Sequence, residues 1–270
     1  MNKTLRDIIY DTVIETNEKL TPGEVEKAVA AATGFDREDI KLAIRDLVSQ
    51  GELSYTYLYG TSYLERSFDR PIRVSTRIVI KPPDKVYKAQ AGEVVIDIAT
   101  GAAFGSGAHP STVLALRAMD AALPELHRVS QGTPFKGLDV GTGSGILAIA
   151  MTKLGVQEVV AIDIDPNAIF EATHNIRLND LAAQVTVSDS SLEELTTHFQ
   201  VIVANLAHPT LKKFGLLFSN RMEKDGLLVL SGFKEEAFEP LCSVYSEKGF
   251  MLIRQEKERE WVATTFRKSA

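Results

Sequence analysis

The stretch Leu-Asp-Val-Gly-Thr-Gly-Ser-Gly-Ile occupies residues 138–146 and decides the fold. An apolar run that ends in closely spaced glycines is typical of a strand that turns sharply into a helix, because glycine tolerates tight-turn backbone angles and leaves room for a ligand. Strand-like runs alternate with helix-like stretches along the rest of the chain, which predicts an α/β fold with a mainly parallel sheet. The expected strands are residues 137–141, 157–163, 184–188, 200–205, 226–231, 249–254 and 260–267. The last two are joined only by a charged turn, so we expect them to pair antiparallel.

The spacing of the glycines separates two kinds of cofactor. Gly141, Gly143 and Gly145 form G-x-G-x-G, whereas dinucleotide-binding enzymes use G-x-G-x-x-G. The carboxylate of Asp139 precedes them; it would repel a pyrophosphate and suits a cofactor with a cationic methionyl amine and a sulfonium. We therefore expect S-adenosyl-L-methionine to bind here. The alternative is a tight strand–helix turn that binds no ligand.

Acidic and polar residues follow the next two predicted strands. Asp163 ends the strand at 157–163, where a carboxylate can accept hydrogen bonds from both ribose hydroxyls of a nucleoside. Asp165 precedes a proline and is expected to cap the next helix. Asp189 and Ser190 end the following strand, where an adenine amino group would be met, although polar residues at strand ends are common in any α/β fold.

The chain is expected to contain two domains. Residues 1–70 predict three short helices, with Thr21 and Asp36 as helix starts, followed by an aromatic β-hairpin around Gly60, which together resemble a winged-helix domain. The proline-containing residues 71–91 predict a linker. Residues 92–270 form the α/β domain.

Two further motifs carry a family resemblance. Residues 103–112 read AFGSGAHPST and residues 203–207 read VANLA. With LDVGTGSGILAIA and IDIDPNAI, these motifs resemble the PrmA family, whose members methylate a protein of the large ribosomal subunit. The resemblance extends over about residues 92–267. It implies a Rossmann-like seven-stranded class I methyltransferase sheet, S-adenosyl-L-methionine as cofactor, and N-methylation of a lysine or the N-terminus of a protein acceptor.

The resemblance also implies roles for individual residues. Phe104, Gly105 and Ser111 would lie over the cofactor. Asn205 would face the transferred methyl group, where its side-chain carbonyl and the backbone carbonyl of Leu206 direct the lone pair of an amine towards the sulfonium carbon.

Two histidines near these motifs have competing interpretations. We interpret His109 as a structural anchor for its turn rather than as a base. His208 either assists the amine or caps the next helix. No metal ligand is expected.

The chain departs from the family pattern in two places. Residues 99–101 read Ala-Thr-Gly, where the family usually has Asp-Pro-Gly. The family's substrate-recruiting N-terminal domain has a ferredoxin-like fold, whereas residues 1–70 predict a winged-helix-like domain.

The charge of residues 1–70 disfavours nucleic acid as a partner. Nine Lys/Arg and thirteen Asp/Glu give 9 − 13 = −4, a surface that would repel phosphates. The aromatic hairpin suits a protein or peptide better, unless half of its tyrosines pack against the third helix or the domain serves structure or dimerisation. These tyrosines are Tyr55, Tyr57, Tyr59 and Tyr63.

Three functions remain open from the sequence. The first is methylation of a protein amine. The second is methylation of a small metabolite, with the front domain as a lid or dimer interface. The third is a DNA-binding regulator with a cofactor-sensing domain.

The bulk composition excludes several other classes. The chain has 270 residues, a formal charge of −6 and one cysteine, Cys242, so no internal disulfide or cysteine-rich zinc site is possible. No stretch has the length of a signal peptide or a membrane span. We expect a soluble, cytoplasmic protein.

Overall fold

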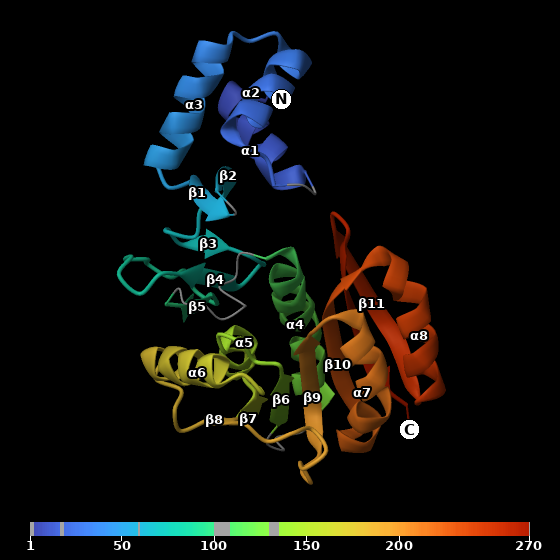
Figure 1. Cartoon of the computed structure of the whole chain (residues 1–270). Helices are drawn as coiled ribbons and strands as arrows, with labels where there is room; N and C mark the ends of the chain where they lie inside the picture. Colours follow the sequence, from blue (N-terminus) through green and yellow to red (C-terminus); the bar gives the residue numbers. More distant parts are fainter. Residues whose placement is uncertain (1–2, 17–18, 59, 100–108, 130–134, 270) are drawn as a thin grey trace. The chain divides into compact units, whose positions relative to one another are not determined.

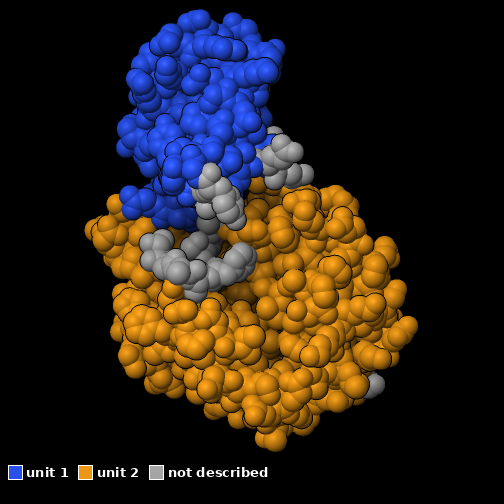
Figure 2. Space-filling model, in the orientation of Figure 1, with its two compact units in different colours: residues 1–70 blue, residues 71–270 orange. Residues whose placement is uncertain are grey.

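The computed structural model describes residues 3–16, 19–58, 60–99, 109–129 and 135–269. It divides into two compact units, residues 1–70 and residues 71–270 (Figure 2). Each unit is considered by itself.

The first unit has three helices and a hairpin. Helices α1 (Leu5–Glu15) and α2 (Pro22–Thr33) each begin with a threonine capping box, and α3 (Arg37–Ser49) begins at Asp36, whose side chain accepts from the backbone N–H of Glu38. Strands β1 (Leu53–Leu58) and β2 (Thr61–Arg66) pair antiparallel. The elements expected from the sequence are therefore present, and the winged-helix name for them stays a prediction.

The second unit is built on a seven-stranded sheet. Its order is β11-β12-β10-β9-β6-β7-β8, and β12 pairs antiparallel with both of its neighbours while the other pairs are parallel (Figure 1). The expected Rossmann-like sheet and its antiparallel C-terminal pair are confirmed. The strands are β6 (Lys136–Val140), β7 (Glu158–Ile162), β8 (Val185–Ser188), β9 (Phe199–Asn205), β10 (Met222–Lys234), β11 (Phe250–Glu258) and β12 (Trp261–Lys268).

Helices cover both faces of this sheet. Along β9, Val201 and Val203 belong to one hydrophobic cluster, and Ile202 and Ala204 to another, as alternate residues of a strand should when both faces are buried. The first cluster includes residues of α4 (Pro110–Val129), α5 (Ile146–Lys153) and α6 (Pro166–Leu178). The second includes residues of α7 (His208–Arg221) and α8 (Phe238–Glu247).

Residues 71–91, which the sequence predicted as a linker, lie within the second unit. Strands β3 (Ile72–Arg73) and β4 (Ile78–Lys81) form a three-stranded sheet with β5 (Val94–Asp97). Ile78 and Ile80 are buried in the first cluster of the α/β core. The prolines marked breaks in the chain correctly, but the apolar run between them was too short to be recognised as a strand.

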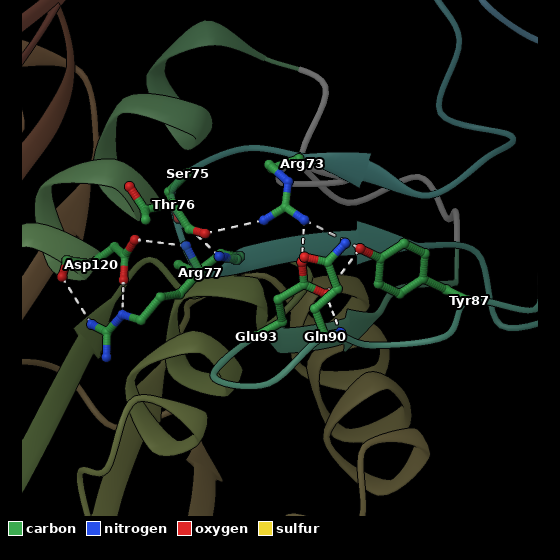
Figure 3. Close-up of polar contacts among 9 residues, drawn as sticks. Arg73, Ser75, Thr76, Arg77, Tyr87, Gln90, Glu93 and Asp120 are labelled. Atoms are coloured by element: carbon green, nitrogen blue, oxygen red, sulfur yellow. Dashed lines mark hydrogen bonds and ion pairs between the residues drawn. The ribbon is translucent and has the colours of Figure 1, made fainter.

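Polar contacts fasten this small sheet to α4 and to its own loop (Figure 3). The backbone and side chain of Arg77 donate to the carboxylate of Asp120 on α4, with Nε 2.6 Å from Oδ1. On the far side of the sheet, Glu93 accepts from Arg73, from the Tyr87 hydroxyl and from the backbone N–H of Gln90. These contacts hold β3–β5 beside the helix that begins at the edge of the candidate site.

The described part of the chain includes no helix that combines the length and the apolar character needed to span a membrane.

Candidate active site at the carboxyl edge of the sheet

A cavity of about 670 Å³ lies at the carboxyl ends of the central strands of the second unit. Its lining includes the residues that follow β6, β7 and β9, together with His109 and Ser111 at the start of α4. The neighbours of β6 are β7 on one side and β9 on the other, so the chain reverses its direction of winding here. In open α/β sheets, such a switch point is where ligands bind.

The glycine turn after β6 is closely packed. Gly141 and Gly145 have φ of +73° and +83°, and both approach a neighbouring segment. A Cβ atom on Gly141 would lie 2.5 Å from Leu206 Cδ2, and one on Gly145 would lie 3.1 Å from the Cα of Ala172 in α6. A larger residue would therefore displace the Leu206 side chain at position 141 and crowd the backbone of α6 at position 145.

Asp139 lies behind this turn and is fully buried. Its Oδ2 accepts hydrogen bonds from Thr142 Oγ1 at 2.7 Å and from the backbone N–H of Ala148 at 3.0 Å, while Oδ1 has no hydrogen-bond donor among the described residues. Burial raises the pKa of this carboxyl to about 7. Asp139 does not line the cavity, so the structure places it as a support of the glycine turn.

Asp163 lines the cavity and is oriented by backbone groups. Its Oδ2 accepts from the N–H of Gly143 at 2.9 Å and its Oδ1 from the N–H of Asp165 at 3.0 Å. Each oxygen keeps a second lone pair that can accept a ligand hydroxyl. Asp165 caps α6 as expected, accepting from the N–H of Asn167.

The two residues expected near an adenine are placed differently. Ser190 lines the cavity, and its hydroxyl lies 2.6 Å from that of Ser188. Asp189 is exposed and is not part of the lining.

Asn205 lies at the end of β9 and faces the same cavity. Its Nδ2 donates to Thr112 Oγ1 at 3.2 Å, which fixes the orientation of the amide. Its Oδ1 is buried and accepts no hydrogen bond from the described residues. A buried carbonyl without a donor is costly and rare, which marks this residue among those that line the cavity.

The start of α4 is tied to these strand ends. Ser111 is buried; its backbone N–H donates to His109 Nδ1 at 3.3 Å, and its hydroxyl lies 2.8 Å from the same nitrogen. The ring of His109 lies edge-on to Trp261, with centroids 4.5 Å apart. These contacts hold the His109 ring in place, as expected for a structural anchor of its turn. His208 is exposed at the start of α7, where Ala207 is the N-cap residue.

The sequence analysis did not identify two of the aromatic residues that line the cavity. Trp261 begins β12, and Phe214 lies on α7. An antiparallel β12 must begin where β10 ends, so its first residue reaches the carboxyl edge; the predicted topology contained this signal for Trp261. Nothing local marks Phe214. Phe104 and Gly105 lie outside the described residues.

Comparison with known proteins identifies the family. The family model described as ribosomal protein L11 methyltransferase (PrmA) matches residues 64–269. The chain belongs to the PrmA family. The resemblance seen in the sequence is therefore confirmed, and membership of the PrmA family implies S-adenosylmethionine as methyl donor.

Individual relatives agree with this assignment. The chain is 41% identical over 199 residues to a ribosomal protein L11 methyltransferase of Geobacter sp. (strain M21), covering 74% of this chain and 64% of that protein. A protein of the same name from Exiguobacterium sibiricum is 35% identical over 264 residues, with 92% and 80% covered. The chain thus spans slightly less than two thirds of the length of the Geobacter PrmA protein.

A solved structure shares the fold. The ribosomal protein L11 methylase of Lactobacillus delbrueckii subsp. bulgaricus superposes with a TM-score of 0.65 at 27% identity, covering 74% of this chain and all of the other.

Gly232→Ala tests the packing around Asn205. Gly232 has a φ of +87°, and a Cβ there would lie 2.7 Å from the backbone N and O of Leu206 and 2.8 Å from Asn205 Oδ1. We expect the free energy of unfolding in urea to fall by about 3 kcal/mol or more. The matched control is Gly249→Ala, where φ is +81° and the nearest atom ends a flexible lysine side chain; it should cost only about 1 kcal/mol. Equal losses would contradict the close packing.

Asp139→Asn tests the buried carboxyl. Because its pKa rises from 3.8 to about 7 on folding, the folded protein holds a proton that the unfolded chain releases between these values. Wild-type stability should therefore fall across this window, whereas the asparagine variant has no such group. The free energy of unfolding of the variant, relative to that of wild type, should rise by about 2 kcal/mol between pH 5 and pH 8 in urea unfolding. A difference that does not depend on pH would rule out the raised pKa.

Proposed function

We propose that this chain is an S-adenosylmethionine-dependent methyltransferase that methylates an amine of a protein, a lysine or the N-terminus. The observation that carries the proposal is the position of Asn205, which lines the cavity beside the glycine turn and whose buried Oδ1 accepts no hydrogen bond from the described residues. The relatives in the PrmA family are named for ribosomal protein L11, so that protein is the first acceptor to test. Membership of the family favours the enzyme over the sensor or the ligand-free turn.

The cavity supports the placement of the cofactor. We assign its ribose to Asp163, whose two oxygens are already aimed by backbone donors, and its adenine to the side of Ser190 and Asp189. Gly141, Gly143 and Gly145 would border the methionyl part, with Asp139 acting through the turn that it supports. Ser111 lines the same cavity, and Phe104 and Gly105 are assigned to the cofactor by the family motif alone.

The chain's own groups then account for the reaction. Bound S-adenosylmethionine supplies an electrophilic methyl group; the amine nitrogen forms a bond to this carbon as the carbon–sulfur bond breaks. Asn205 Oδ1 and the carbonyl of Leu206 would hold the amine with its lone pair in line, and such alignment can account for several kcal/mol of the barrier.

The amine must first lose a proton. With a pKa of about 10.4, roughly one lysine in 2,500 is neutral at pH 7. A partly desolvated pocket and a nearby cation both lower that pKa. Water can then take the proton, so the mechanism does not require His109 or His208 as a base.

The first unit is proposed to dock the acceptor protein. Residues 1–63 precede the part of the chain that the family model matches, so the support for docking comes from the surface of the first unit itself. Tyr55 and Tyr57 are 50% and 71% exposed on one face of β1. Tyr63 is half-buried, and Tyr59 lies outside the described residues. We also propose the cytoplasm as the location, since ribosomal acceptors are found there.

Labelled cofactor tests the acceptor. The chain is incubated with methyl-labelled S-adenosylmethionine and either purified ribosomal protein L11 or cell extract. The extract comes from a strain in which the gene for the methyltransferase has been deleted. A labelled L11 band supports the proposal, and a different labelled protein moves it to that acceptor. Label only in small molecules would establish the metabolite methyltransferase instead.

Asn205→Ala tests the role of its carbonyl. We expect kcat to fall about 100-fold or more, while the Kd for S-adenosylmethionine, measured by calorimetry, changes less than about threefold. Asp163→Ala should show the converse, a Kd raised about tenfold with a smaller effect on kcat. Equal losses of kcat and cofactor affinity in Asn205→Ala would remove it from the methyl-transfer step.

A double substitution, Tyr55→Ser with Tyr57→Ser, tests docking by the first unit. Both side chains are exposed, so the fold should survive, and we expect KM for the acceptor protein to rise about tenfold with cofactor affinity unchanged. The control is Met251→Ser, which removes a side chain that is 57% exposed in the second unit. An unchanged KM would exclude these tyrosines from recognition.

A further inference from the structure

One buried amide joins the glycine turn to the chain that leaves β5. Asn175 on α6 is 1% exposed. Its Nδ2 donates to the backbone carbonyl of Ser144 at 2.9 Å, and its Oδ1 accepts from the backbone N–H of Ala99 at 3.0 Å. Ser144 lies between Gly143 and Gly145, so a single side chain bridges the proposed cofactor turn and a distant segment.

A second amide, one turn further along α6, holds β5 without reaching the glycine turn. Asn179 Oδ1 accepts from the N–H of Asp97 at 3.0 Å, and its Nδ2 donates to the Asp97 carbonyl at 2.7 Å. Among the described residues, none of the hydrogen bonds of Asn179 goes to residues 141–145. Asn179 therefore contacts the end of β5 but not the glycine turn, whereas Asn175 contacts both Ala99 and the turn.

Two hydrogen bonds also hold the start of α4. The carbonyl of Ser111 accepts from Ser231 Oγ at 2.9 Å, and Thr112 Oγ1 accepts from Asn205 Nδ2 at 3.2 Å. Ala99 is thus tied through Asn175 to the glycine turn, and Ser111 and Thr112 to the ends of β9 and β10.

We propose that Asn175 is a positioning residue for the cofactor. Its two hydrogen bonds fix the position of the glycine turn relative to Ala99. This proposal rests on the proposed function. The site needs a donor towards Ser144 and an acceptor towards Ala99 on the same planar group, which among side chains of this size only asparagine offers. The contact of Gly145 with Ala172 keeps α6 against the turn, so the amide spans a short and rigid gap.

The test compares Asn175→Asp with Asn179→Asp in the full chain. Aspartate keeps the acceptor and removes the donor in both cases, so each variant loses the Nδ2 contacts of one amide. We expect Asn175→Asp to raise the Kd and KM for S-adenosylmethionine tenfold or more, with kcat at saturating cofactor within threefold of wild type. Asn179→Asp should leave both constants within threefold. Asn175→Ala, which removes both contacts, should weaken cofactor binding at least as much as Asn175→Asp.

Hydrogen exchange without cofactor provides an independent measurement. Asn175→Ala, which removes both contacts, should speed amide exchange both in the glycine turn and at Ala99, whereas Asn179→Ala should speed it only around Asp97. Near-ultraviolet circular dichroism checks that each variant is folded.

Three results separate the proposals. The positioning role would be overturned if Asn175→Asp bound the cofactor with wild-type affinity, or if Asn179→Asp lost as much cofactor affinity as Asn175→Asp. Asn175 would then serve only to pack α6 against its neighbours. Unchanged exchange in the glycine turn would overturn it as well. If the wild-type chain bound no S-adenosylmethionine, the proposed function would fail, and the cofactor role of Asn175 would fail with it; faster exchange at both segments would then show the bridge as structural only.

Discussion

The close approach between the glycine turn and the end of β9 sets the geometry at the carboxyl edge of the sheet. Leu206 lies where a side chain on Gly141 would be, and α6 lies where a side chain on Gly145 would be. Because protein interiors are densely packed, such contacts leave few alternative positions for the segments involved. Hydrogen bonds then orient Asp163, Asn205 and the start of α4 at this edge.

Polar groups around the turn show where the packing leaves hydrogen-bonding capacity unused. Asp139 Oδ1 and Asn205 Oδ1 are both buried, and neither accepts a hydrogen bond from the described residues. They differ in position, since Asp139 is enclosed behind the turn and Asn205 faces the cavity. An unsatisfied group inside the core adds cost to the fold, whereas one at a cavity wall is available to a ligand. This difference is consistent with the proposed roles, in which Asp139 supports the turn and Asn205 holds the amine.

The two units carry different parts of the proposed activity. The family model matches the α/β unit and the end of the first unit, and the proposed methyl transfer is assigned to residues within this match. The helices and most of the hairpin of the first unit precede that match, and its exposed tyrosines form a surface of a different kind. We therefore assign the chemistry to the shared unit and the choice of acceptor to the first unit.

Much of the fold and part of the site could be predicted from short stretches of the sequence. The glycine spacing, the seven strands, the antiparallel C-terminal pair and the cap at Asp165 depend on neighbouring residues and on periodicity, which a sequence displays directly. Tertiary structure alone decided that residues 71–91 join the second unit, that Asp139 supports the turn, and that Phe214 lines the cavity. The same holds for the bridge made by Asn175, whose partners are Ala99 and Ser144. These features depend on which distant segments meet, and a hydrogen bond between residues far apart in the chain leaves no periodic trace in the sequence.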